Sequence, residues 1–225
     1  MGCLGVYFAM TGDLITAGYC TLTGIFLDFF DGLAARLLKV SSELGKQLDS
    51  LADLITSGLV PALIVFQLFS AELYDVNLFP HQPWYAFIAF IIVLGSAYRL
   101  AKFNIDDAQS DKFIGLPTPA NTLLILSLAF ILEYSSLDWI KPIILNHAFL
   151  LILSLVSVVL LNMNVELFSL KLKSFNFKEN RLVYVFLMYA VGILVFLRFI
   201  GVPIIIVSYI LVSIISKKKS AKQNV

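Results

Sequence analysis

Long apolar segments, separated by short polar or charged stretches, run through the whole chain. We expect these segments to form helices, and they cover residues 2–10, 14–38, 48–70, 84–100, 120–132, 142–163, 182–197 and 199–216. A helix needs about 20 residues to cross a bilayer, and the segment 2–10 has only about half of that length. The pattern predicts an all-α, polytopic membrane helical bundle of about eight transmembrane helices, the first one truncated, forming a single integral membrane domain over residues 1–225.

Composition favours a membrane protein and argues against a nucleic-acid-binding one. Hydrophobic residues make up 60% of the chain and charged residues 14%, a balance unlike that of soluble globular domains. The formal net charge is only +1, and no basic stripe is interleaved with exposed aromatic residues. We therefore expect membrane lipids as partners and no nucleic acid.

Four acidic residues lie between two of the apolar segments. Asp28 and Asp31 are three residues apart, so a helix places both carboxylates on one face. Asp49 and Asp53 are four residues apart and form a second acidic face on the next predicted helix. The connection, roughly residues 38–44, is short enough to make the two helices an antiparallel hairpin. We expect the four carboxylates to converge at the end of this hairpin.

Carboxylates at a membrane boundary need a compensating charge. Each costs about 2.5 to 3.5 kcal/mol to insert, and clustered oxygen ligands suit hard divalent ions such as Mg²⁺ or Mn²⁺. We therefore expect a metal site, with two ions chemically reasonable. The alternatives are a surface hairpin with solvated acids, which the apolar flanks disfavour, and a cation transporter. No charged residues continue across the opposite half of the predicted bundle, which disfavours the transporter.

The acidic segment also carries a complete family motif. The pattern D-x2-D-G-x2-A-R-x8-G-x3-D-x3-D is matched at every fixed position by Asp28, Asp31, Gly32, Ala35, Arg36, Gly45, Asp49 and Asp53. Fixed residues at fixed gaps make chance agreement far less plausible than for a lone glycine-rich fingerprint. The chain resembles the CDP-alcohol phosphotransferase family through this motif.

The resemblance implies a membrane enzyme that cleaves a CDP-linked lipid or alcohol between its two phosphates. CMP leaves, and an alcohol takes the phosphoryl group. It further implies a catalytic core over residues 11–136, additional transmembrane helices and a basic cytoplasmic tail over residues 137–225, and a homodimer.

Roles for the motif residues follow from the same resemblance. Asp28, Asp31 and Asp49 would hold metal and diphosphate, and Asp53 would complete the metal set and act as the general base on the attacking hydroxyl. Gly32 and Ala35 present almost no side chain, so a nucleotide can approach their helix closely. The residues expected near the cytidine nucleotide or easing its access are Asp28, Gly32, Ala35, Arg36 and Gly45.

A second stretch, residues 97–121, bears on which alcohol is used. Its RLAKFN run and its FIGLPTPAN loop resemble the members of the family that use L-serine and CDP-diacylglycerol. Arg99 and Lys102 share one helix face and could receive the serine carboxylate, or could only anchor the helix at the membrane surface. The loop residues expected at the substrate are Gly115, Pro117 and Thr118. The alternative acceptors are glycerol 3-phosphate and inositol phosphate.

The cations predict the orientation. Of the 16 Lys and Arg residues, only Lys141 and Arg198 fall on the side opposite to the acidic hairpin when the crossings alternate. The others are Arg36, Lys39, Lys46, Arg99, Lys102, Lys112, Lys171, Lys173, Lys178, Arg181, Lys217, Lys218, Lys219 and Lys222. By the positive-inside rule, we expect a multi-pass protein of the cell membrane with its active site facing the cytoplasm.

Overall fold

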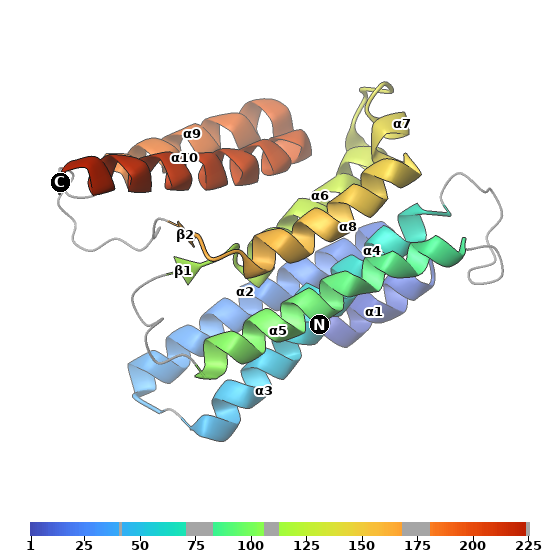
Figure 1. The fold of residues 1–225 in the computed structure, drawn as a ribbon. Helices are drawn as coiled ribbons and strands as arrows, with labels where there is room; N and C mark the ends of the chain where they lie inside the picture. The colour runs from blue at the N-terminus through green and yellow to red at the C-terminus, as the bar shows by residue number, and fades with distance from the viewer. Residues whose placement is uncertain (41, 71–82, 106–112, 168–180, 224–225) are drawn as a thin grey trace.

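Helices dominate the computed structural model of the protein, which describes residues 1–40, 42–70, 83–105, 113–167 and 181–223 (Figure 1). The α-helices are α1 (Gly2–Met10), α2 (Leu14–Leu38), α3 (Glu43–Asp53), α4 (Val60–Leu68), α5 (Ile91–Ile105), α6 (Thr118–Tyr134), α7 (Lys141–Ile144), α8 (His147–Asn162), α9 (Arg181–Leu197) and α10 (Gly201–Gln223). A π-helical segment, η1 (Leu54–Leu59), joins α3 to α4, and the 3-10 segments η2 (Trp84–Phe90) and η4 (Arg198–Ile200) precede α5 and α10. The short strands β1 (Phe113–Ile114) and β2 (Glu166–Leu167) pair in antiparallel fashion.

Four helical stretches of the described chain are long and apolar enough to cross a membrane. They are Leu14–Ala35, Glu43–Leu68, Trp84–Ile105 and Val183–Ile215. The last contains both α9 and α10, which fold back on each other as a hairpin (Figure 1). α6 and α8 are apolar but shorter. The predicted all-α membrane bundle is confirmed, whereas the number of about eight crossings stays a prediction.

Local capping explains where α2 and α3 begin. α2 begins at Leu14, as expected, after a break in which Gly12 has a φ of +83° and the Asp13 carboxylate accepts a hydrogen bond from the Thr16 N–H at 2.9 Å. α3 begins at Glu43, earlier than the predicted residue 48. The Ser42 hydroxyl accepts a hydrogen bond from the Gly45 N–H at 3.0 Å, so it satisfies a donor that would otherwise be unpaired at the first turn.

Before Pro61, the α3–α4 rod changes helix type. Proline lacks the N–H that would bond to the carbonyl of Ser57, four residues earlier. Residues Leu54–Leu59 widen into a π-helix, and the Thr122 hydroxyl of α6 donates to the Ser57 carbonyl at 2.9 Å. The chain therefore continues as one helical rod from Glu43 to Leu68, with a neighbouring helix supporting the irregular turn.

The expectation of one helix over residues 142–163 was wrong. α7 ends at Ile144, and α8 begins only at His147. The Asn146 side chain causes the restart because its oxygen accepts hydrogen bonds from the N–H groups of Ala148 and Phe149 at 2.9 and 3.2 Å. Length and hydropathy alone did not reveal this internal cap.

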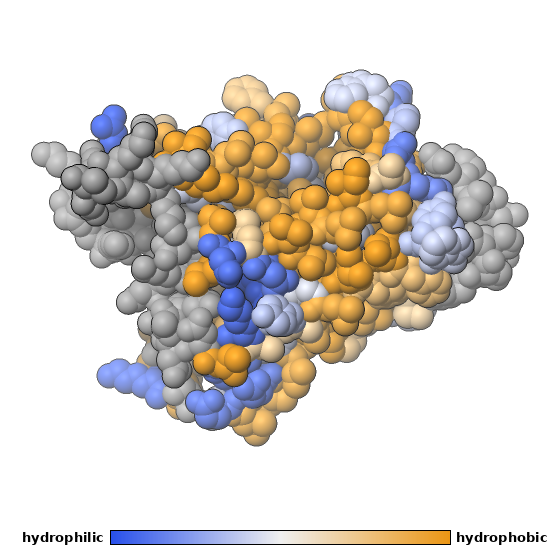
Figure 2. Space-filling model, viewed as in Figure 1, coloured by the Kyte–Doolittle hydropathy of each residue, from blue (hydrophilic) through white to orange (hydrophobic). Residues whose placement is uncertain are grey.

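The main core surrounds α4, all of whose residues are buried. α1, η2 and α6 pack around it, and α8 packs along α5. A second, smaller core contains Leu116, Leu167, Ile206 and Ile210, and it fixes α10 to the segment before α6 and to β2. Most of the surface in this view is apolar, and hydrophilic side chains gather over α3 and the adjoining end of α5 (Figure 2). That polar end contains the candidate site.

Some of the sequence predictions concern parts that the structure does not describe. The side chains of Arg36, Lys112, Lys171, Lys173, Lys178, Lys217, Lys218, Lys219 and Lys222 lie outside the described residues. The orientation that these cations predict rests on the sequence pattern.

Candidate active site

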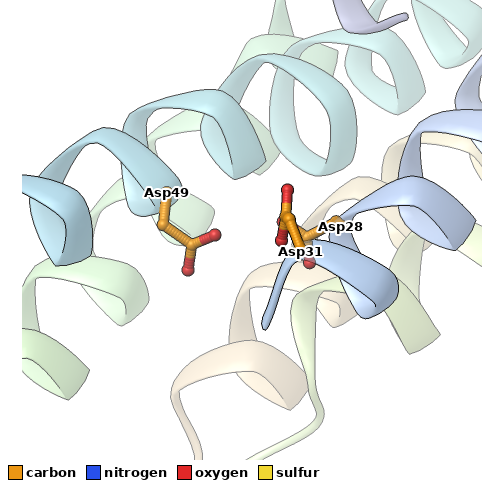
Figure 3. Close-up of side chains that lie close together, drawn as sticks. All are labelled: Asp28, Asp31 and Asp49. Carbon is orange, nitrogen blue, oxygen red and sulfur yellow. The ribbon is translucent and has the colours of Figure 1, made fainter. Parts of the chain in front are cut away.

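Three carboxylates converge where α2 and α3 face each other. Asp28 and Asp31 project from the end of α2, and Asp49 points toward them from α3 (Figure 3). One oxygen atom from each side chain lies within 4.8 Å of the others. Asp28 is half-buried, and Asp31 and Asp49 are exposed. The structure brings the two acidic faces together, as the helical spacing predicts.

Asp53 lies beside this cluster. It is the last residue of α3, and it lines a cavity of about 270 Å³ together with Asp28 and Asp31. Its carboxylate is close enough to Asp49 and to Arg99 of α5 for the charges to interact. A carboxylate between an acidic cluster and a cation suits proton transfer as well as metal binding. The choice between these two roles stays a prediction.

The small motif residues lie along the same two helices. A Cβ added at Gly32 would meet no described atom within 4 Å, so no described helix packs closely there. Ala35 is half-buried one turn later, and Arg36 follows in the α2 backbone. At Gly45, an added Cβ would lie 3.0 Å from the Ser42 hydroxyl that caps α3. Gly32 thus keeps side-chain bulk off this part of α2, and Gly45 leaves room for the cap.

Asn104 ties the acidic hairpin to α5, a role that the sequence did not reveal. Its side-chain amide donates to Gln47 Oε1 at 3.1 Å and to Ser50 Oγ at 2.9 Å, and its carbonyl accepts from Lys46 Nζ at 2.7 Å. All three partners belong to α3, the helix that carries Asp49. Asn104 ends the RLAKFN run, so the signal was present, but only the fold shows which helix it meets.

The two predicted acceptor-binding cations lie on α5, facing the end of α8. Arg99 is partly buried, and its Nη1 lies 3.5 Å from the Thr118 hydroxyl. Lys102 Nζ donates to Asn164 Oδ1 at 3.3 Å. Arg99 is also the cation near Asp53. These contacts connect the predicted acceptor residues to the acidic cluster.

The predicted loop is fixed in place by the end of α8. Gly115 has a φ of +74°, and a Cβ there would lie 2.5 Å from the Leu161 carbonyl oxygen, so only glycine fits. The Gly115 N–H donates to the Val165 carbonyl at 3.0 Å. Pro117 follows as the N-cap residue of α6, and buried Thr118 is the first residue of that helix. The loop therefore presents Thr118 toward Arg99.

The sequence did not predict that α8 contributes polar groups to this region. Asn162 and Asn164, at and just beyond the end of α8, lie against α5 beside Arg99 and Lys102. Both stand at the end of a long apolar segment. A polar residue at the end of an apolar segment is a weak signal until its spatial neighbours are known.

The donor set of the acidic cluster fits a divalent metal ion. Asp28, Asp31 and Asp49 offer carboxylate oxygens only, which is the ligand type that Mg²⁺ and Mn²⁺ prefer. Their closeness would otherwise place like charges together at the edge of an apolar bundle, at considerable electrostatic cost. These three residues would hold the metal, and Asp53, which does not belong to this close group of three, borders the same cavity as Asp28 and Asp31.

Comparison with known proteins identifies several similar sequences. The chain is similar to a CDP-diacylglycerol–serine O-phosphatidyltransferase of Bacillus subtilis, at 35% identity over 130 residues that cover 57% of this chain and 68% of the relative. It is 36% identical to the enzyme of the same name from Saccharomyces cerevisiae over 135 residues, or 55% of this chain and 45% of the relative. An archaetidylserine synthase of Methanothermobacter thermautotrophicus is 28% identical over 139 residues, or 61% of this chain and 56% of the relative.

The family profile covers the described site. A profile of the CDP-alcohol phosphatidyltransferase family matches residues 2–160, which include the acidic hairpin, α5, the loop before α6 and most of α8. The match spans more than half of the chain and contains every residue of the acidic motif. The protein therefore belongs to the CDP-alcohol phosphatidyltransferase family.

Proposed function

We propose that this protein transfers the phosphatidyl group of CDP-diacylglycerol to L-serine, giving phosphatidylserine and CMP. The observation that carries the proposal is the convergence of Asp28, Asp31 and Asp49 at the polar end of an apolar helical bundle. Membership in the family supports the reaction class. The names of the similar proteins from bacteria and yeast support serine as the acceptor.

The carboxylates hold divalent metal, Mg²⁺ or Mn²⁺, and two ions are proposed. Asp28, Asp31 and Asp49 are the primary ligands, and Asp53 joins them at the edge of the cluster. When bound, such ions neutralise the diphosphate and polarise phosphorus toward attack. The three carboxylates lie within one small volume, which supports this assignment.

CDP-diacylglycerol binds with its nucleotide along α2 and its acyl chains in the bilayer. Gly32 and Ala35 let the nucleotide approach the helix, and Arg36 supplies a cation for it. Gly45 keeps the start of α3 clear of side-chain bulk. The small side chains at Gly32 and Ala35 support a close approach of the nucleotide to the helix.

Asp53 acts as the general base. It takes the proton of the serine hydroxyl as the serine oxygen bonds to the phosphorus of the phosphatidyl group and the bond from that phosphorus to the CMP oxygen breaks. Arg99 and Lys102 receive the serine carboxylate, and the loop of Gly115, Pro117 and Thr118 holds Arg99 in position. The interaction between Asp53 and Arg99 supports a shared acceptor site.

The proposed setting is the cell membrane, with the site open to the cytoplasm. The distribution of Lys and Arg along the sequence supports this orientation. The protein is proposed to work as a homodimer, as the family resemblance implies. Cross-linking in native membranes tests the dimer independently of the reaction.

Acceptor-dependent CMP release tests the function. Purified full-length protein in detergent is incubated with CDP-diacylglycerol, Mg²⁺ or Mn²⁺, and one acceptor at a time: L-serine, glycerol 3-phosphate or inositol phosphate. We expect CMP and phosphatidylserine with serine, and little CMP with the phosphorylated acceptors. Equal or faster turnover with glycerol 3-phosphate would instead assign a phosphate-bearing acceptor to the same site.

A further inference from the structure

A small cavity lies beside Arg99, between α5 and the end of α8. Its volume is about 20 Å³, and its lining comes from α5, β1 and the last turn of α8. The polar lining residues are Arg99, Lys102 and Asn162. A volume of this order accommodates about one water-sized group, such as an ammonium group. The cavity is therefore large enough for one end of a small ligand.

Two residues that line this cavity carry buried polar atoms of complementary chemistry. Arg99 Nε is a buried donor and Asn162 Oδ1 a buried acceptor, and neither has a hydrogen-bond partner among the described residues. Leaving a buried polar atom unpaired is unfavourable. One unpaired donor and one unpaired acceptor on residues that line the same space indicate a ligand that offers both kinds of group.

The orientation of the Asn162 amide is fixed. Its Nδ2 donates to the Gly95 carbonyl at 3.1 Å and to the Val158 carbonyl at 3.0 Å. Rotating the amide by half a turn would place its oxygen against both carbonyl oxygens, which is unfavourable. Oδ1 is therefore the atom left without a partner, and it can only accept a hydrogen bond.

These constraints distinguish between acceptor classes. A phosphate would suit Arg99 and Lys102, but it would place a negatively charged oxygen against Asn162 Oδ1, which repels it. An α-amino acid suits both sides, because its carboxylate can accept from Arg99 while its ammonium donates to Asn162 Oδ1. The carboxylate also offsets the two cations that would otherwise repel the ammonium.

We infer that Asn162 is a specificity-determining residue that accepts a hydrogen bond from the ammonium group of an amino-acid acceptor. This inference rests on the proposed transfer to serine, and it adds a residue near the end of α8 to that site. Arg99 lines the cavity and its charge also interacts with Asp53, so an amino acid held there can direct its hydroxyl toward the proposed base.

The test compares two acceptors that differ only in the ammonium group. L-serine and 3-hydroxypropionate share the hydroxyl and the carboxylate, and kcat/KM for each is measured with the purified wild type and with Asn162→Leu. Leu has a similar size and no acceptor atom. We expect the preference for serine over 3-hydroxypropionate to fall about ten- to a hundred-fold, through a higher KM for serine, because a hydrogen bond to a charged group is lost.

Two further variants separate recognition from structure. Asn162→Asp keeps an oxygen acceptor but loses the Nδ2 donors, so we expect it to retain the preference for serine. Ser154→Ala on the same helix removes a hydroxyl that bonds to the Leu150 carbonyl, away from the cavity, and should leave the preference unchanged. A folded Asn162→Leu variant with the wild-type preference would overturn the inference and leave a bound water as the occupant.

The wild type provides a test that needs no variant. If 3-hydroxypropionate is used as well as serine, the ammonium has no partner and the inference fails. If Asn162→Leu does not fold, a folded Asn162→Asp variant that has lost the preference also overturns it. Failure of the wild type to use serine at all would refute the proposed function itself, so the two failures are distinguishable.

Discussion

The α2–α3 hairpin and the α9–α10 hairpin both expose many apolar side chains, but the first also presents a cluster of acids. No residue of α3 is buried, and its exposed Asp49 faces the other acids of the site. The α9–α10 hairpin exposes apolar side chains, among them Met188, Val195 and Phe196, the last at 86% of its surface. Exposure in a membrane protein thus has two meanings: contact with lipid for the apolar side chains of both hairpins, and access for polar ligands at the acids of the first.

The two hairpins are also held in different ways. Asn104 fixes α3 to α5 through directional hydrogen bonds with Gln47 and Ser50. α9 and α10 pack through apolar side chains, and the described contacts include a hydrogen-bonded hydroxyl pair, Tyr189 and Ser208, at 2.9 Å. Carboxylates that share a metal must be placed accurately, whereas a lipid-facing pair of helices needs only apolar packing.

Metal removal should have the largest effect, and it should act on the first hairpin. Chelation with EDTA should abolish CMP release, and added Mn²⁺ or Mg²⁺ should restore it, because the carboxylates cannot bind the diphosphate without cations. CMP release is measured before and after metal is returned. Full activity in chelator would contradict the metal site. It would also remove the reason for treating the first hairpin as ligand-binding and the second as lipid-facing.

Substituting two acids of the first hairpin one at a time should tell the general base from the residue that binds metal and nucleotide. Asp53→Asn should lower the rate of CMP release by about 10² to 10⁴ because it removes the proton acceptor. Its CDP-diacylglycerol binding, measured by thermal stabilisation, should largely survive. Asp28→Asn should weaken both. Equal loss of nucleotide binding in the two variants would make Asp53 a metal ligand and assign the base to another group.

A matched pair of variants tests the hydrogen bonds that hold the two hairpins. Asn104→Ala should lower CMP release roughly ten- to a hundred-fold because α3 loses its attachment to α5 and the carboxylates shift. Ser208→Ala removes the hydroxyl pair of the second hairpin and should leave the rate unchanged. Both rates are measured on protein with wild-type elution in size-exclusion chromatography. Equal effects would show that accurate helix placement matters in both hairpins alike.

Alanine substitutions at two glycines compare how strongly the loop beside the site and the second hairpin depend on glycine for stability. Gly115→Ala should destabilise the protein by about 1 to 3 kcal/mol because alanine is strained at positive φ and its Cβ would meet the Leu161 carbonyl. Gly192→Ala in α9 meets no described atom within 4 Å and should be neutral or slightly stabilising. Thermal unfolding in detergent distinguishes the two. A neutral Gly115→Ala would mean that the loop can shift away from α8.

The smallest expected effect concerns the far end of α2, away from the acids. The Thr16 hydrogen bonds hold the pKa of Asp13 below its usual value, so its contribution to stability is present above the unfolded pKa, about 3.9, and is lost as pH falls through the folded pKa. Asp13→Ala should cost about 1 kcal/mol at pH 7, and less near pH 3. Asn146→Ala removes an uncharged cap, and its cost, also followed by thermal unfolding, should not depend on pH. A pH-independent cost for Asp13→Ala would exclude a charged cap.

Local patterns in the sequence determined the class of the protein and the position of its acids. Apolar length predicts membrane helices because lipid requires backbone hydrogen bonds to be satisfied within the segment. Helical spacing predicts that Asp28 and Asp31 share one face, and the short connection predicts the hairpin that brings Asp49 to them. Each of these properties depends on neighbours within a few residues.

Only the tertiary structure decided which distant residues complete the site. Asn104 meets α3, and Asn162 reaches the cavity beside Arg99, through helix packing between segments more than fifty residues apart. The support of the π-helical turn by Thr122 depends on packing in the same way. A polar residue in an apolar helix looks the same in sequence whether it faces lipid, protein or ligand. Its function is fixed by the surface it meets, which local periodicity does not specify.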